Sequence, residues 1–193
     1  HDIFRNFFGS RNVHDISDDD DDDVHFSRKM RKGQVIEHNL NCSLEELYVG
    51  KCKKIKISRK IIKNNRRENE EKMIEIDIKP GWKEGTKITY PNLGDEEPGI
   101  EPGDICFIVK EKKHDVFKRD GNDLRMEIVI SINEAKSGFT KKIKLLDNTT
   151  TDIKIPSLKR SDYIHIVKGK GMPTKDKIKA YGNLQINFVI TLD

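Results

Sequence analysis

The residues with the clearest binding chemistry are the lysines and isoleucines that alternate between Lys53 and Ile57. Successive side chains of an extended strand point to opposite faces, so Lys53, Ile55 and Ile57 share one face. Lys54 and Lys56 lie on the other. A strand edge with a cation beside apolar residues can bind an extended peptide, with main-chain hydrogen bonds for affinity and apolar pockets for alternate side chains. The alternative is that the isoleucines are ordinary core and the lysines a solvated face.

Motifs for catalysis or metal binding are missing from the sequence. There is no Gly-x-Ser-x-Gly elbow, no His-Glu-x-x-His and no Walker sequence, and the histidines are scattered without ligand spacing. Gly169–Pro173 lacks the Lys-Ser/Thr that completes a phosphate loop and is predicted to be a turn. The adjacent acids Glu45 and Glu46 are interpreted as solvated surface residues. We therefore predict that the protein is not an enzyme and uses no cofactor and no metal.

The composition describes a heavily charged surface, since 34% of the 193 residues are hydrophobic and 36% are charged. No stretch approaches the ~18 apolar residues of a membrane span. The acidic run Asp18–Asp23 offsets part of the lysine content, which leaves a net charge of +4. The remaining chain is basic, above all from Lys51 to Lys63, so a basic nucleic-acid-binding module is the alternative function. That alternative lacks an aromatic stacking pattern and a recognition helix.

Cysteine usage bears on the compartment. The three cysteines, Cys42, Cys52 and Cys106, are odd in number and lack CxxC spacing. This pattern indicates neither a disulfide framework nor a zinc site. A reducing compartment is the simplest interpretation and predicts a cytoplasmic protein, while export to another compartment stays open.

Short alternating strands separated by turns are predicted for most of the chain after Gln34. Pro-Gly, Asp-Gly and Asp-Asn pairs separate the strands, and the charged segment 64–71 is also predicted to be a turn. The fold class is therefore mainly β. The apolar alternation is clearest in three runs: 74–78, 105–109 and 184–190.

Two short helices are predicted to position the strands that follow them. The first is Leu44–Val49, with Ser43 as its N-cap. The second is Asn133–Ser137, with Ser131 or Asn133 as its N-cap.

An internal repeat organises these elements into two copies. The segment 40–57 aligns without a gap on 128–145, at an offset of 88 residues that carries Gly50 to Gly138. A repeat of this length indicates a duplicated domain rather than a solenoid. We predict two tandem homologous β-sandwich-like domains, each with one short helix, at 34–112 and 113–193. The matched residues include Glu46 with Glu134 and the Lys-Lys-Ile-Lys quartets 53–56 and 141–144.

Residues 1–33 are predicted to be a disordered linker. They contain an aromatic cluster followed by the six consecutive acids Asp18–Asp23, a block that repels itself and buries little apolar surface. The run lacks the spaced acids and central glycine of a calcium loop.

Several motifs in order are similar to the C-terminal peptide-binding region of type II (class B) DnaJ proteins, the J-domain heat-shock co-chaperones. The resemblance covers about Gln34 to Asp193, and Asp2–Gly9 resembles the end of that family's Gly/Phe-rich linker. Type I members carry CxxCxGxG repeats that this sequence lacks, which implies type II. The motifs that carry the resemblance are Ser43–Gly50, Lys79–Tyr90, Gly103–Ile105, His114–Leu124, Glu134–Gly138 and Gly169–Pro173.

The resemblance implies a function without catalysis: binding unfolded client polypeptides and delivering them to a DnaK-type chaperone. It also implies that the partner's acidic C-terminal tail, which ends in Glu-Glu-Val-Asp, docks on the first domain. The family's dimerisation helix would follow the last strand, so the full-length protein is expected to be a homodimer and this fragment a monomer. The J-domain would precede His1, and no His-Pro-Asp occurs within the chain. No membrane or nucleic-acid partner is expected.

Two sets of site residues follow from the resemblance. The family's tail-binding lysines match Lys53 and Lys72 of this sequence, and Lys54 and Lys56 lie nearby. In the second domain the strand recurs, but tail binding is not expected there. The substrate-peptide groove of the first domain is expected to be lined by His38, Leu40, Ile55, Ile57 and Phe107.

Overall fold

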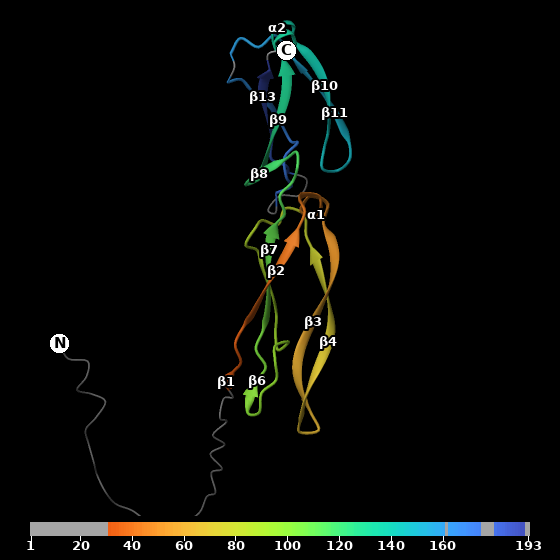
Figure 1. Cartoon of the computed structure of the whole chain (residues 1–193), viewed down its shortest axis with the longest axis vertical. Helices are drawn as coiled ribbons and strands as arrows, with labels where there is room; N and C mark the ends of the chain where they lie inside the picture. Colours follow the sequence, from red (N-terminus) through yellow and green to blue (C-terminus); the bar gives the residue numbers. More distant parts are fainter. Residues whose placement is uncertain (1–30, 161, 175–179, 192–193) are drawn as a thin grey trace, which may run out of the picture.

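The computed structural model describes residues 31–160, 162–174 and 180–191. Two β-rich units lie end to end along the long axis of the molecule (Figure 1). The mainly β fold class is confirmed, with two short helices in the described part of the chain. Most of the linker predicted at 1–33, including Asp18–Asp23, lies outside the described residues.

The first unit contains a three-stranded sheet, a long two-stranded hairpin and a small two-stranded sheet at its far end. In the three-stranded sheet, ordered β2-β7-β5, β2 runs parallel to β7 and β5 runs antiparallel to it. The hairpin is β3-β4 and the small sheet is β1-β6. The elements are β1 (Arg31–Lys32), β2 (Ile36–Cys42), α1 (Leu44–Val49), β3 (Lys51–Lys63), β4 (Arg66–Ile78), β5 (Lys87–Tyr90), β6 (Ile100–Glu101) and β7 (Ile105–Glu111).

The second unit repeats this plan with a shorter hairpin, β10-β11. Its larger sheet is ordered β12-β13-β9-β8, and β9 runs parallel to β13 as β2 does to β7. The two units therefore share topology as well as sequence. The elements are β8 (Lys118–Asp120), β9 (Asp123–Ser131), α2 (Ile132–Ser137), β10 (Phe139–Lys144), β11 (Thr150–Ile155), β12 (Ile164–Val167) and β13 (Leu184–Thr191).

Each helix begins at a capping box, in which the serine side chain accepts from the backbone N–H of a glutamate that in turn accepts from the serine N–H. The first helix is Leu44–Val49, as predicted. The second begins at Ile132, one residue before the predicted start, because Ser131 is the N-cap. Both helices end at a glycine with positive φ, Gly50 at 87° and Gly138 at 82°.

The β3-β4 hairpin is longer than the sequence patterns indicated. The segment 64–71, predicted to be a turn, is a two-residue turn followed by the start of β4. Asn64 and Asn65 take φ values of 48° and 63°. Two consecutive left-handed residues form the type I′ turn that matches the twist of the flanking strands, and asparagine tolerates this conformation. Charged residues thus extend the hairpin instead of interrupting it.

Isoleucines on one face of the hairpin pack onto the three-stranded sheet to form the core of the first unit. Ile74, Ile76 and Ile78 are at most 4% exposed. The Tyr90 hydroxyl of β5 donates to the Glu75 carbonyl at the outer edge of β4 (2.9 Å) and fastens the hairpin to the sheet. In the second unit the corresponding core includes Leu124, Ile130, Ile143, Ile153, Ile155, Leu184 and Ile186.

Arg119 joins the two units. Its side chain is only 4% exposed and pairs with Glu111 (2.5 Å). The guanidinium also donates to the Trp82 carbonyl (2.7 Å) in the first unit and to the Gly121 carbonyl (2.8 Å) in the second. Because these acceptors belong to both units, Arg119 fixes how the units meet.

His114 makes a second link between the units. Its Nδ1 accepts hydrogen bonds from the N–H groups of Val116 (3.0 Å) and Phe117 (2.9 Å). Because Nδ1 is an acceptor, Nε2 carries the proton and donates to Glu45 of α1 (3.1 Å). Glu45, which the sequence patterns placed among solvated acids, therefore has a specific partner. Burial acts to raise the pKa of Glu45, but its hydrogen bonds and the neighbouring His114 hold that pKa below its usual value.

Two further features concern the described residues only. None of the helices there is long and apolar enough to cross a membrane. Within the same ranges, no group of three or more His, Cys, Asp and Glu side chains is placed to hold a metal ion. Cys42, Cys52 and Cys106 are free thiols.

Candidate functional site

The register of the β3-β4 hairpin divides the four predicted tail-binding lysines between two faces. Lys53 lies opposite Ile76, and Lys72 lies opposite Ile57. Directly opposite residues of antiparallel strands share a face, so both lysines lie on the face that carries the isoleucines. Lys53, Ile55, Ile57 and Lys72 are therefore brought together on one side of the hairpin.

Lys54 and Lys56 lie on the opposite, solvated face. The Lys54 ammonium contacts Glu75 of β4 at 2.8 Å, and the Lys56 ammonium contacts Glu71 at 2.5 Å. All four side chains are more than half exposed, so solvent screens both pairs and they contribute little to stability. Neither lysine shares a face with Lys53 and Lys72.

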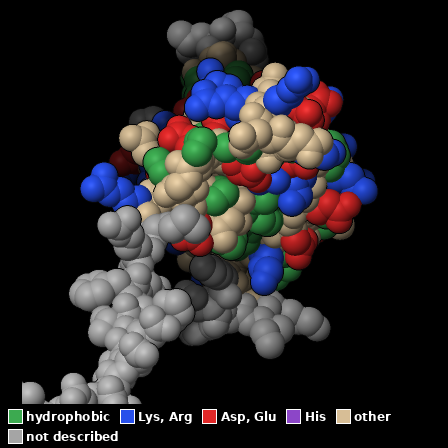
Figure 2. All heavy atoms as spheres, turned by 90° about the horizontal axis from the view of Figure 1, so that it is seen from below, with side chains coloured by type: hydrophobic (Ala, Val, Ile, Leu, Met, Phe, Trp, Pro, Cys, Tyr) green, Lys and Arg blue, Asp and Glu red, His purple; other side chains and the backbone are tan. Residues whose placement is uncertain are grey.

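Acids across the hairpin pair with part of the basic stretch 51–63. Besides the pairs of Lys54 and Lys56, the Arg59 guanidinium contacts Glu70 at 2.6 Å. Figure 2, which views the molecule from below, shows Lys and Arg side chains mixed with Asp and Glu side chains over the described surface of that end. A nucleic-acid backbone requires a continuous field of one sign, and these pairs interrupt it. These ion pairs weaken the sequence feature on which the nucleic-acid alternative rests.

Lys53 is the most enclosed of the four lysines. Its side chain is 21% exposed, and its ammonium contacts Glu46 of α1 at 2.6 Å. The same ammonium donates to the main-chain carbonyl of Asn41, at the end of β2 (2.7 Å). Lys53 thus ties β3 to β2 and to the first turn of the helix.

Glu46 is a site residue that the sequence analysis missed. Its Oε2 accepts from the Ser43 N–H (3.0 Å) and contacts Lys53, while its Oε1 contacts Lys51 at 3.3 Å. Burial acts to raise the pKa of this carboxyl, but the hydrogen bonds from Lys53 and Ser43 hold it below its usual value. The Ser-x-x-Glu spacing from Ser43 to Glu46 was the signal that could have identified it.

Three of the five predicted groove residues belong to the core of the first unit. Leu40, Ile57 and Phe107 are 2%, 5% and 1% exposed. His38 is exposed and its ring stacks on Phe107 with centroids 5.8 Å apart, while Ile55 is half-buried. The accessible part of the predicted groove therefore consists of Ile55 and His38, with Phe107 beneath.

The outer edge of β3 has main-chain groups free to pair with another strand. Near the hairpin tip, the N–H of Lys60 donates to Asp95 (2.8 Å) and that of Ile62 donates to Glu96 (2.9 Å). The main-chain N–H groups of these even-numbered residues therefore point away from β4. Main-chain groups alternate in direction along an antiparallel ladder, so those of residues 54, 56 and 58 also point outward. No main-chain partner for these three occurs among the described residues.

The edge of β2 faces outward in the same region. The Ile36 N–H pairs with the Asp104 carbonyl at the start of β7 (2.8 Å), which assigns the even-numbered residues of β2 to β7. The main-chain groups of residues 37, 39 and 41 therefore point outward, and the Asn41 carbonyl accepts a hydrogen bond from the Lys53 ammonium. Two strand edges thus border Ile55 and His38.

The second unit repeats the lysine arrangement less tightly. Lys141 contacts Glu134 at 3.4 Å and donates to the Val129 carbonyl at 3.1 Å. Phe139 stands where the first unit has Lys51, and the Lys141 ammonium lies 5.5 Å from the centre of its ring. Glu134 therefore contacts one lysine where Glu46 contacts two.

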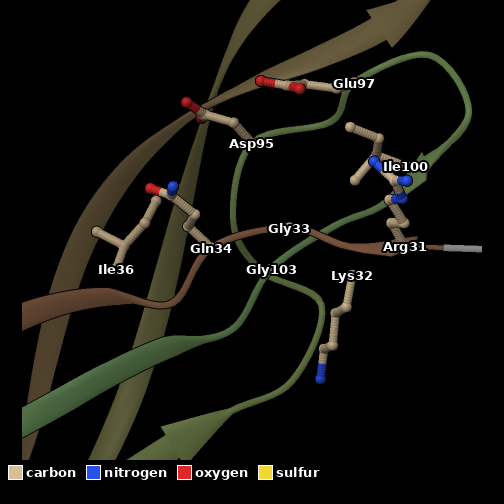
Figure 3. Close-up of a pocket in the computed structure, with 9 residues that line it drawn as sticks. All are labelled: Arg31, Lys32, Gly33, Gln34, Ile36, Asp95, Glu97, Ile100 and Gly103. Atoms are coloured by element: carbon tan, nitrogen blue, oxygen red, sulfur yellow. The ribbon is translucent and has the colours of Figure 1, made fainter.

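A hollow of about 580 Å³ lies at the far end of the first unit, away from these residues (Figure 3). Asp95 and Glu97 line it, and the Lys32 side chain points away to pair with Asp104 (2.8 Å). Gly103 allows two chain segments to cross here, since a Cβ at that position would lie 1.9 Å from the Gln34 carbonyl oxygen. The hollow contains none of the predicted site residues, and its glycines have a structural role.

Comparison with known proteins identifies relatives over most of the chain. The family described as DnaJ C terminal domain matches residues 36–192. DnaJ protein homolog 1 of Drosophila melanogaster is 39% identical over 170 residues, which cover 85% of this chain and 49% of that protein. DnaJ homolog subfamily B member 5 of Homo sapiens is 36% identical over 165 residues, covering 84% of this chain and 47% of that protein.

Protein SIS1 of Saccharomyces cerevisiae is 37% identical over 158 residues, which cover 81% of this chain and 44% of that protein. The chain thus spans about half the length of the curated relatives it matches.

Proposed function

This chain belongs to the DnaJ C-terminal domain family, with class B relatives as the motifs indicated, and we propose that it is the client-binding part of a heat-shock co-chaperone. In this proposal the two units are peptide-binding domains at 34–112 and 113–193. They hold unfolded polypeptide and present it to a DnaK-type chaperone in the cytoplasm. No catalytic step is involved.

The acidic tail of the partner chaperone is proposed to bind along the outer edge of β3. The observation that carries this proposal is the shared face of Lys53, Ile55 and Lys72, beside a strand edge with free main-chain groups. The five residues from Lys53 to Ile57 span about 13 Å at ~3.3 Å per residue, which is long enough for the ~10 Å of a four-residue Glu-Glu-Val-Asp tail in extended form. The tail's carboxylates would pair with the lysines while its valine contacts Ile55.

Lys54 and Lys56 have a smaller part in this proposal. Their ammonium groups lie on the other face and pair with Glu75 and Glu71. Because these acids neutralise their charge, the two lysines would add little attraction for an acidic tail, and salt screens what remains within about 10 Å at 0.1 M.

Client polypeptide is proposed to bind at the accessible part of the predicted groove, Ile55 and His38, which we call the apolar strip. Ile55 and His38 are accessible there, whereas Leu40, Ile57 and Phe107 are packed in the core. An extended client segment would pair with the strand edge and place one apolar side chain against Ile55. Contact with Phe107 would require the hairpin to separate from the sheet.

Fluorescence anisotropy with a labelled Glu-Glu-Val-Asp peptide tests tail binding. Lys72→Ala should weaken binding several-fold, because Lys72 is exposed on the isoleucine face and has no ion pair within the described ranges. Lys56→Ala, on the opposite face, is the matched control and should change the affinity little. Equal affinities for wild type, Lys72→Ala and Lys53→Ala would reject the tail site.

Suppression of client aggregation tests the apolar strip. Ile55→Ser should reduce suppression with little loss of stability, because Ile55 is only half-buried. Ile143→Ser is an unsuitable control, since Ile143 is 5% exposed and its loss would unfold the second unit. Thr89→Ser on β5 is a better one. Undiminished suppression by Ile55→Ser would count against this surface.

A further inference from the structure

Lys53 already has a carboxylate partner inside the first unit. Its ammonium lies 2.6 Å from Glu46 Oε2 and 2.7 Å from the Asn41 carbonyl oxygen. With side-chain exposures of 21% for Lys53 and 16% for Glu46, the pair is shielded from solvent. A carboxylate that arrives from a bound peptide must therefore displace Glu46 from Lys53 or share the lysine with it.

Glu46 is also held where a ligand carboxylate would sit. Its two oxygens contact the ammonium groups of Lys51 and Lys53, and the Ser43 N–H fixes its orientation. Because Glu46 is part of the same chain, it competes as an intramolecular ligand whose effective concentration is high at all times. Its lowered pKa keeps it charged at neutral pH.

We propose that Glu46 is a specificity-determining residue of the first unit, which competes with peptide carboxylates for Lys53 and so limits the preference of the site for acidic over neutral peptides. This inference rests on the proposed tail site. A neutral peptide has no carboxylate to place on Lys53 and leaves the Glu46 contact intact. An acidic peptide gains from Lys53 only what remains after Glu46 has been displaced.

The second unit supplies a natural contrast. Glu134 has the same capping role, but its contact to Lys141 is longer, 3.4 Å against 2.6 Å. Phe139 replaces the second lysine. Capping therefore accounts for a glutamate in both units. Among the described residues, contact with two lysines, one of them at 2.6 Å, occurs only at the glutamate of the first unit.

Glu46→Gln separates the two roles of the residue. Glutamine keeps an oxygen that accepts from the Ser43 N–H, so the capping box persists, while the charge that competes for Lys53 is lost. Glu134→Gln is the matched control, because it makes the same change at the equivalent cap of the second unit.

The measurement is the affinity of each variant for two peptides, one ending in Glu-Glu-Val-Asp and one ending in Gln-Gln-Val-Asn with an amidated C-terminus. Glu46→Gln should bind the acidic peptide roughly 3- to 10-fold more tightly, as expected for release of a partly shielded ion pair. The neutral peptide should bind as it does to wild type, and Glu134→Gln should change neither affinity. Equal or weaker binding of the acidic peptide by Glu46→Gln would overturn the inference and make Glu46 a residue that positions Lys53.

A second measurement uses the wild-type protein and so does not depend on whether a variant folds. In wild type, the carboxyl carbon of Glu46 should shift in the NMR spectrum when the acidic peptide saturates the site, because its contact to Lys53 is replaced. An unchanged signal at saturation would contradict the competition. If wild type fails to bind the acidic peptide at all, the proposed tail site fails; if it binds but Glu46→Gln does not bind more tightly, only the competition fails.

Discussion

Replacing Arg119 by alanine should destabilise the protein more than removing the charge of Arg125, Lys54 or Lys56, whose ion pairs are exposed. The Arg119 guanidinium is 4% exposed, pairs with Glu111 and donates to the Trp82 and Gly121 carbonyls. Its loss leaves Glu111, which is 20% exposed, without its partner and two carbonyls without a donor. Breaking a buried pair in this way costs about 3–5 kcal/mol. We expect about 3 kcal/mol, because Glu111 retains some access to water.

Urea denaturation of the purified chain measures this loss directly. A loss of about 3 kcal/mol corresponds to a fall of roughly 6–12 °C in Tm for a folded region of this size. Arg125→Ala is the matched control on the same hairpin, since Arg125 pairs with Asp120 at side-chain exposures of 52% and 59% and should contribute at most about 1 kcal/mol. If Arg119→Ala loses less than about 1 kcal/mol, the junction is not held as described.

Three further predictions follow from local geometry. Gly50→Ala should lower the free energy of unfolding by about 1–2 kcal/mol in a denaturation experiment, because φ is 87° and a Cβ would lie 3.0 Å from the Ile78 carbonyl oxygen. Gly85→Ala should lower it less, because φ there is 84° but the Cβ would meet open space. Asn65→Gly should raise stability by a few tenths of a kcal/mol, because Asn-Gly suits a type I′ turn best. Folding lowers the pKa of Glu46. The stability that its carboxylate contributes is therefore present above the unfolded-state pKa and is lost as pH falls through the folded-state pKa. Glu46→Gln should remove this loss and flatten the acid side of a plot of stability against pH.

The sequence predicted the fold from patterns with a direct physical cause. Period-two alternation located the main strands, and residues suited to the N-cap position located both helices, the second to within one residue of its start. The patterns failed at 64–71, because a polar, charged segment has no apolar face to reveal that it is a strand. A hairpin that extends beyond the core needs only a suitable turn and cross-strand ion pairs.

The candidate site was predictable only in part. Alternation placed Lys53 and Ile55 on one face, but it could not reveal that Lys72 of β4 would join them, since register across a hairpin depends on the turn. The role of Glu46 was hidden because its partners come from β2, β3 and the helix cap. Burial of Leu40 and Phe107 likewise follows from packing of the hairpin on the sheet, which a single strand does not encode.

Amide protection along β3 tests directly whether an acidic peptide adds to this strand edge. If an acidic peptide adds to the outer edge of β3, hydrogen exchange followed by NMR should slow at residues 54, 56 and 58, whose N–H groups point outward. It should change little at 53, 55 and 57, whose N–H groups already pair with β4. Alternating protection at saturating peptide is the predicted result. Bound peptide with no added protection at 54–58 would contradict the account.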